Sequence, residues 1–207
     1  MCIAEPALVA LLVGSMVPAF AAMLTLTFMK RPNKWRSFFG RLNPVRGTQV
    51  GMLFSLAFLD QGAVLEELGW RGFAAPELQR VMDSPLRVAL AIGIFWGLWH
   101  LPRDLTTGVL ERLGPTIYLA LYLPSFLMGT ISVSMIAAYF MNRLGGSVLP
   151  AVVIHGITND SVGISGSASI VEALTPYHQF TKNSLLALVA FAIVVLAGSA
   201  LGRRSAR

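Results

Sequence analysis

The sequence is poor in charge and in cysteine. Only 13% of its 207 residues are charged and 55% are hydrophobic, whereas soluble domains carry about 25% charged residues. The single cysteine, Cys2, excludes a disulfide framework and a zinc site made of thiolates. Charge is absent from residues 184–202, and residues 1–29 hold one charge, Glu5. Each run approaches the roughly 20 residues that a helix needs to cross a bilayer.

Apolar segments recur along the whole chain. Together they predict an all-α fold, a polytopic transmembrane helical bundle, and one membrane domain over residues 1–207. The third and fifth segments are short and carry polar residues, so we expect them to line an interior rather than to face lipid. We expect residues 165–183 to form a polar loop. The six segments cover residues 7–29, 50–73, 86–101, 116–141, 148–164 and 185–201.

Basic residues flank the first and last segments. This placement is typical of topology signals and anionic-lipid contacts, and it argues against nucleic-acid binding despite a net charge of +6. The positive-inside rule places the first basic loop in the cytoplasm, but six full spans would then place the C-terminal arginines outside. This conflict predicts a re-entrant segment or a further helix. The basic residues are Lys30, Arg31, Lys34, Arg36, Arg41 and Arg46 in the loop, and Arg203, Arg204 and Arg207 at the end.

Two adjacent carboxylates interrupt the second segment. Glu67 and Arg71 are four residues apart and share a helix face, with the acid on the favourable N-terminal side. We therefore expect them to pair with each other. Glu66 points elsewhere and stays available for chemistry. The alternative is an interfacial charge cluster at a helix end.

Two further motifs place polar side chains one helical turn apart. Trp96 and His100 lie in the third segment, and His155 and Asn159 lie in the fifth. Taken singly, such a histidine or histidine–amide pair is often a structural hydrogen-bonding element between membrane helices. Together with Glu66 they supply a carboxylate base, two imidazoles and an amide donor, which suffices to activate water against a carbonyl. We therefore expect the three motifs to converge on one polar cavity.

The order of these motifs resembles the CPBP family of intramembrane proteases. This family includes the type II CAAX prenyl endopeptidases and the bacteriocin-processing, Abi-like proteins. The resemblance covers residues 50–160, and it departs in having Trp96 where phenylalanine is commoner and in having one apolar segment ahead of the first motif. The residues that carry it are Glu66, Glu67, Arg71, Gly72, Phe73, Trp96, His100, Leu101, Pro102, His155 and Asn159.

The resemblance implies an endopeptidase acting on peptides or proteins in or at the membrane. Prenylated CAAX peptides are one substrate class that it suggests. We predict Glu66, Glu67, His100, His155 and Asn159 as catalytic residues, with Glu66 as general base, and Arg71 and Trp96 as supporting residues. Glu66, His100 and His155 are also a reasonable ligand set for Zn²⁺ or another divalent metal. A metal-free glutamate mechanism fits the same residues, and the sequence leaves both open.

The sequence is also compatible with two kinds of protein that are not enzymes. A self-immunity or scaffold protein of the same fold would need the helices without the full residue set, and the intact set favours the enzyme. A small proton-coupled transporter could use Glu66 and the histidines as a relay, but no inverted repeat supports it. The basic loop suggests a multi-pass protein of a bacterial-type plasma membrane, in contact with the bilayer. The oligomeric state is not predicted.

Overall fold

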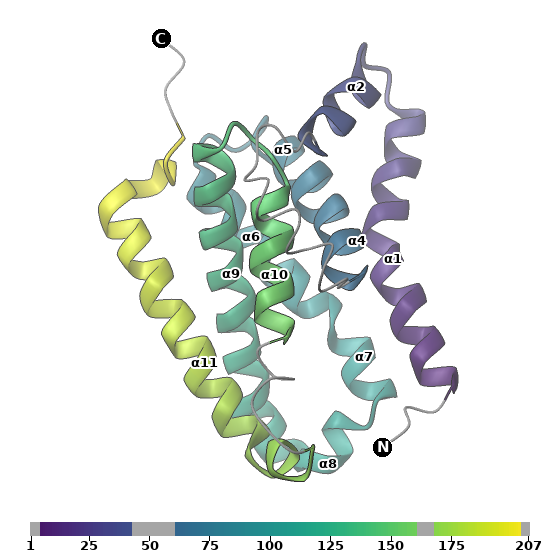
Figure 1. Cartoon of the computed structure of the whole chain (residues 1–207), viewed down its shortest axis with the longest axis vertical. Coiled ribbons are helices and arrows are strands. Elements are labelled where there is room, and N and C mark those ends of the chain that lie inside the picture. The colour runs from purple at the N-terminus through teal and green to yellow at the C-terminus, as the bar shows by residue number, and fades with distance from the viewer. Residues whose placement is uncertain (1–4, 43–60, 161–167, 204–207) are drawn as a thin grey trace.

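The computed structural model describes residues 5–42, 61–160 and 168–203, and every regular element in these ranges is helical (Figure 1). This confirms the all-α prediction. The main helices are α1 (Glu5–Phe28), α4 (Gln61–Gly69), α6 (Pro85–Trp99), α9 (Leu123–Arg143), α10 (Leu149–Asp160) and α11 (Ala168–Ala197). Shorter elements are α2 (Lys34–Phe39), η1 (Gly40–Leu42), η3 (Trp70–Ala74), α5 (Ala75–Leu78), α7 (Leu101–Thr106), α8 (Val109–Ile117), η4 (Tyr118–Tyr122) and η5 (Gly198–Ala200).

Helix α9 is the centre of the bundle, and glycines let its neighbours approach closely. A Cβ atom on Gly93 of α6 would lie 2.5 Å from the Ile131 Cα of α9. On the other side of α9, a Cβ on Gly129 would lie 2.5 Å from Asn183 Oδ1 of α11. Small residues at helix contacts are the usual means by which membrane helices pack backbone to backbone. The depth and rotation of α6 and α11 around α9 are fixed in this way.

Helices α1 and α4 run in the same direction. Gly69 packs against Pro18, and further along both segments Arg31 donates to both carboxylate oxygens of Glu77 at 2.8 Å. Both helices therefore point toward the end of the bundle that carries α2 (Figure 1). As a result α2 and the end of α11 lie at the same end of the bundle (Figure 1). The described part of the basic loop thus lies at the same end as the last turn of α11, whereas six full spans would place the two at opposite ends.

Two π-helical turns precede prolines. Segment η3 ends at Ala74, two residues before Pro76, and η4 ends at Tyr122, two residues before Pro124. Proline has no N–H and its ring displaces the carbonyl four residues earlier, and single widened turns of this kind recur at functional sites. The carbonyl four residues before Pro76 belongs to Gly72, and Arg41 Nη1 donates to it at 3.3 Å.

The predicted segments match the helices unevenly. Two helical stretches in the described ranges, Val109–Arg143 and Tyr177–Ala200, are long and apolar enough to cross a membrane. Helix α10 has 12 residues, about 18 Å at 1.5 Å per residue, which is shorter than the hydrocarbon core. The count of six spans is therefore not confirmed. Residues 50–60 and 161–164 of the predicted segments lie outside the described residues.

The prediction of a polar loop over residues 165–183 was wrong. Helix α11 begins at Ala168 and continues through the polar stretch. Gln179, Lys182 and Asn183 recur at i, i+3 and i+4, so they occupy one helix face, and all three line the cavity that also contains Glu66. These three polar residues therefore belong to a helix face that meets a cavity and not to a loop.

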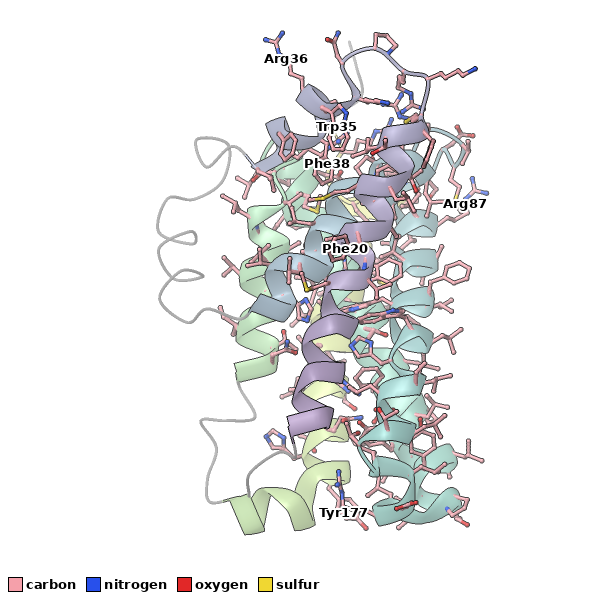
Figure 2. The ribbon with its side chains drawn as sticks, turned by 90° about the vertical axis from the view of Figure 1, so that its right-hand side faces the viewer. Phe20, Trp35, Arg36, Phe38, Arg87 and Tyr177 are labelled. Carbon is pink, nitrogen blue, oxygen red and sulfur yellow. The ribbon has the colours of Figure 1, made fainter. Side chains whose placement is uncertain are left out.

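The two ends of the bundle differ in their side chains. Trp35 and Arg36 lie at the end that carries α2, and Tyr177 lies at the opposite end (Figure 2). Many large apolar side chains between these ends are exposed, among them Phe20, Phe95, Phe191 and Leu196. An apolar flank of this extent is typical of a surface that a bilayer covers.

Candidate active site

A cavity of about 550 Å³ lies among helices α1, α4, α6, α7, α9, α10 and α11. Four of the residues predicted to be catalytic line it, namely Glu66, His100, His155 and Asn159. They come from α4, the end of α6, and α10. The convergence predicted from the sequence is confirmed for these four residues, since α4 and α10 pack side by side and α10 also packs against α9. Trp96, the predicted supporting aromatic, lines the same cavity.

Glu66 is buried, and one of its carboxylate oxygens lies near both Trp96 and His100. Trp96 Nε1 donates to Glu66 Oε2 at 2.7 Å, and His100 Nε2 lies 4.0 Å from the same oxygen. Glu66 is 7% exposed, and it lines the cavity. The indole N–H therefore fixes a carboxylate oxygen next to an imidazole. A phenylalanine, the commoner family residue at position 96, could not make this bond.

The proton on His100 can be assigned from its partner. His100 Nδ1 lies 2.8 Å from the backbone oxygen of Trp96. A carbonyl oxygen only accepts, so Nδ1 carries the proton and Nε2 carries the lone pair. Nε2 and Glu66 Oε2 are then two acceptors 4.0 Å apart. One water molecule can donate a hydrogen bond to each of them.

Glu67 is separated from the cavity by His155. It is fully buried, and its Oε1 accepts from Arg71 Nη1 at 2.8 Å and from His155 Nδ1 at 3.0 Å. The predicted Glu67–Arg71 pair is thus confirmed. Arg71 gives its other hydrogen bond to Ser134 Oγ at 2.6 Å, and no bond from it to Glu66 occurs among the described residues. Glu67 has a role that the sequence did not indicate, because it orients His155.

Trp96 is packed at the centre of these groups. The Arg71 guanidinium carbon lies 4.4 Å from its ring centroid, and the His155 ring lies 4.8 Å away. A cation over an indole face is attracted by the ring quadrupole. The indole therefore separates the Glu67–Arg71 pair from the cavity while it contacts both histidines. This arrangement keeps the two carboxylates in different surroundings.

Several residues in the cavity wall were not anticipated. From α11 they are Gln179, Lys182 and Asn183, and from α7 and α9 they include Arg103 and Phe126. The helical spacing of the α11 residues was a signal that could have found them. Arg103 and Phe126 gave no such signal, because only the tertiary structure brings the Arg103 guanidinium carbon to 5.1 Å from the Phe126 ring at the cavity.

The predicted metal ligands do not form a compact set in this arrangement. Among the described residues, no three His, Cys, Asp or Glu side chains are grouped closely enough to hold a metal ion. Glu66 Oε2 and His100 Nε2 are 4.0 Å apart, whereas two ligands of one tetrahedral zinc lie about 3.4 Å apart when each bond is about 2.1 Å. The metal site stays a prediction.

Fold and site together define a helical bundle with a buried glutamate–histidine centre facing one cavity. The family described as type II CAAX prenyl endopeptidase Rce1-like matches residues 47–160, which contain all three motifs. The chain belongs to this family. It is also 28% identical over 148 residues to CAAX prenyl protease 2 of Methanococcus maripaludis. That alignment covers 70% of this chain and 49% of the relative, so the chain spans about half the length of the relative it matches.

Proposed function

We propose that the protein is an intramembrane endopeptidase in which Glu66 activates a water molecule against a peptide carbonyl. The observation that carries the proposal is the pair of acceptors, Glu66 Oε2 and His100 Nε2, 4.0 Å apart at the wall of one cavity. A water that donates to both keeps its lone pairs directed away from them. Family membership and the similarity to a CAAX prenyl protease support the same reaction class.

The reaction begins when Glu66 takes a proton from this water. The hydroxide oxygen bonds to the carbonyl carbon, and the carbonyl oxygen becomes an oxyanion. Collapse of this intermediate breaks the carbon–nitrogen bond, and the proton held by Glu66 passes to the leaving amine. The products are a carboxylic acid and an amine, and transfer of the acid proton to the amine gives a carboxylate and an ammonium. Trp96 contributes by holding Glu66 Oε2 in place, which is the kind of positioning that makes an attack geometry frequent.

Asn159 and His155 are proposed to stabilise the oxyanion. The Asn159 amide can donate directly, and it lines the cavity one turn beyond His155 on α10. His155 has its Nδ1 on Glu67, so Nε2 donates only when the ring is doubly protonated. Glu67 stabilises that imidazolium, as a buried carboxylate does for a catalytic histidine. The Glu67–Arg71 pair then acts as a positioning element behind His155.

The substrate is proposed to be a membrane-associated peptide or protein, with prenylated CAAX peptides as the first class to test. The exposed apolar flank supports a multi-pass position in a membrane, and the basic residues at the α2 end support a bacterial-type plasma membrane with that end in the cytoplasm. A self-immunity or scaffold protein would use the same helices, but it would not need Glu66 and His100 to face each other.

The decisive experiment compares wild type with Glu66→Gln. Purified protein in detergent is given a labelled peptide with and without a prenyl group, and cleavage is followed by mass spectrometry. We expect wild type to cut and Glu66→Gln to be inactive with an unchanged melting temperature, because glutamine keeps the size and accepts from Trp96. Glu111→Gln, an exposed acid on α8, is the matched control. Cleavage by Glu66→Gln at the wild-type rate would end the proposal.

Metal dependence is tested in the same assay. The acceptor pair needs no metal to hold a water, so we expect cleavage to continue after exhaustive dialysis against a chelator. A loss of activity that added Zn²⁺ restores, with one zinc bound per chain in wild type and none in His100→Ala, would establish the metal site predicted from the sequence.

A further inference from the structure

A second, smaller cavity contains the guanidinium group of Arg71. It has a volume of about 170 Å³ and is lined from η1, η3, α5, α6, α9 and the turns that follow α5 and α9. Arg71 and Ser134 both line it, and Arg71 Nη2 donates to Ser134 Oγ at 2.6 Å, so the charged end of Arg71 lies at its wall. Neither residue lines the cavity that contains Glu66. Glu67 accepts from Arg71 and from His155, so the Glu67–Arg71 pair stands between the two cavities.

Arg41 brings a second cation to this cavity, and its charge is not balanced by contact with an acid. Its only side-chain hydrogen bond among the described residues goes from Nη1 to the Gly72 carbonyl at 3.3 Å. No described Asp or Glu oxygen lies within 4.0 Å of it, since the neighbouring Glu77 pairs with Arg31 at 2.8 Å and with Arg80 at 3.3 Å. Burial lowers the pKa of the Arg41 guanidinium, and the charge of Glu77 opposes this only in part. Arg41 is therefore a half-buried cation that an anion would stabilise.

Neutral donors and an apolar wall complete the cavity. Gln79 lines it, and its side-chain amide makes no hydrogen bond within the described part of the chain. Asn142 also lines it, and its Nδ2 donates to the Leu201 carbonyl at 2.9 Å, which leaves the second N–H of that group available. Buried Val88 and Ile92 of α6 form an apolar wall, which strengthens the interaction of a cation with a bound charge. No Asp or Glu is among the described residues that line this cavity.

We propose that this cavity binds a phosphate group, with Arg41 as its charged ligand and Gln79 and Asn142 as neutral donors. At about 30 Å³ per water, 170 Å³ corresponds to about six water molecules, which leaves room for one phosphate group. A sphere of 170 Å³ is about 7 Å across, so donors on facing walls reach one bound group. The donors come from η1, from the turn after α5 and from α9. A tetrahedral phosphate accepts from several directions, whereas the two oxygens of a carboxylate lie in one plane.

The phosphate can come from a lipid headgroup or from solution. Helices α2 and α5 lie at one end of the bundle (Figure 1), and the cavity is lined from α5 and from the segment that follows α2. Lipid headgroups meet a membrane protein at the ends of its helices, so both sources reach this position. The proposal does not rest on the peptidase function, because the phosphate takes no part in peptide cleavage.

The test titrates the full chain, purified in neutral lipid-free detergent, with inorganic phosphate and with lysophosphatidic acid. Isothermal titration calorimetry gives the affinity, and thermal unfolding gives the accompanying rise in melting temperature. We expect saturable binding of at least one probe, with one site per chain. Potassium chloride of the same ionic strength and a monoacylglycerol with the same acyl chain, which lacks the phosphate, should leave the melting temperature unchanged.

Variants assign the binding to the cavity. Arg41→Gln should weaken it about tenfold to a hundredfold, the worth of a hydrogen bond to a charged group. Gln79→Glu should abolish it, because this nearly isosteric change places a carboxylate in the cavity without removing a described side-chain hydrogen bond. The matched control is Arg36→Gln, which removes an exposed cation at the same end of the bundle but outside the cavity (Figure 2), and it should bind as wild type does. Arg71 is left intact because it pairs with buried Glu67.

The outcomes separate the two sources and can overturn the proposal. Binding of both probes, each weakened in Arg41→Gln, would show a site for any phosphate group, and binding of lysophosphatidic acid alone would assign the site to a lipid headgroup. Absence of saturable binding by either probe to wild type would refute the proposal. Equal weakening in Arg36→Gln and Arg41→Gln would also refute it, because the binding would then reflect surface charge. So would wild-type affinity in a folded Gln79→Glu protein, which keeps the test valid if Arg41→Gln does not fold.

Discussion

His155 Nδ1 lies 3.0 Å from Glu67 Oε1, although 88 residues separate them in the sequence. The same carboxylate oxygen accepts from Arg71, so one oxygen connects a buried cation to a histidine in the cavity wall. The other oxygen, Oε2, is buried without a partner among the described residues. The charge of Glu67 is therefore balanced at a single atom, and the orientation of His155 depends on it.

Arg71→Ala should act mainly on stability. It leaves Glu67 as a buried carboxylate whose only remaining described partner is His155, and breaking a buried ion pair costs about 3–5 kcal/mol. We expect a large fall in melting temperature and in detergent-solubilised yield. Arg87→Ala removes an exposed arginine that points away from the bundle (Figure 2), and it should change stability by less than about 0.5 kcal/mol. Equal melting temperatures for the two variants would contradict the buried pair.

Trp96→Phe should lower the rate while the protein stays folded. The phenyl ring keeps most of the packing, but the N–H that holds Glu66 Oε2 at 2.7 Å is lost. Loss of a hydrogen bond to a charged group is worth about 1.5–3 kcal/mol, so kcat/KM should fall about tenfold to a hundredfold. The comparison is Trp99→Phe, which changes an indole in the same cavity that packs on Trp70 and His100. If both variants lose the same activity, the bond to Glu66 is not the cause.

Asn159→Ala should fold normally and lose turnover. Removal of one oxyanion donor typically costs about 10²–10³-fold in kcat, with a smaller effect on KM because the donor acts on charge that develops in the transition state. Thr106→Ala removes another polar group that lines the same cavity from α7, and it should retain most of the activity. A KM effect without a kcat effect in Asn159→Ala would indicate substrate binding instead.

Gly93→Ala should destabilise the bundle, although Gly93 itself does not line the cavity. The new Cβ would lie 2.5 Å from the Ile131 Cα, and a backbone atom cannot move aside cheaply, so α6 and α9 must separate. Overpacking of this kind costs about 1–3 kcal/mol. Gly40→Ala, where nothing lies within 4 Å of the added carbon, is the matched control. Thermal unfolding of both variants in detergent measures the difference, and an unchanged Gly93→Ala would mean that the helices are less closely packed.

The chain by itself determined the relations that lie within one helix. Glu67 and Arg71 pair because a helix brings residues four apart onto one face, and Trp96 reaches His100 for the same reason. The helical class follows from apolar runs with little charge. The i, i+3, i+4 spacing of Gln179, Lys182 and Asn183 also indicates one helix face. The polar composition of residues 165–183 instead suggested a loop, so this helix was not predicted.

The tertiary structure decided every contact between helices. The partner of Glu66 is Trp96, that of Glu67 is His155 and that of Arg71 is Ser134, and no local spacing relates these pairs. These contacts depend on the rotation and the depth of each helix in the bundle. The close approaches at Gly93 and Gly129 set the rotation and depth of α6 and α11 relative to α9. The shared end of α2 and α11 has the same origin, because α1 and α4 pack in parallel rather than as successive crossings.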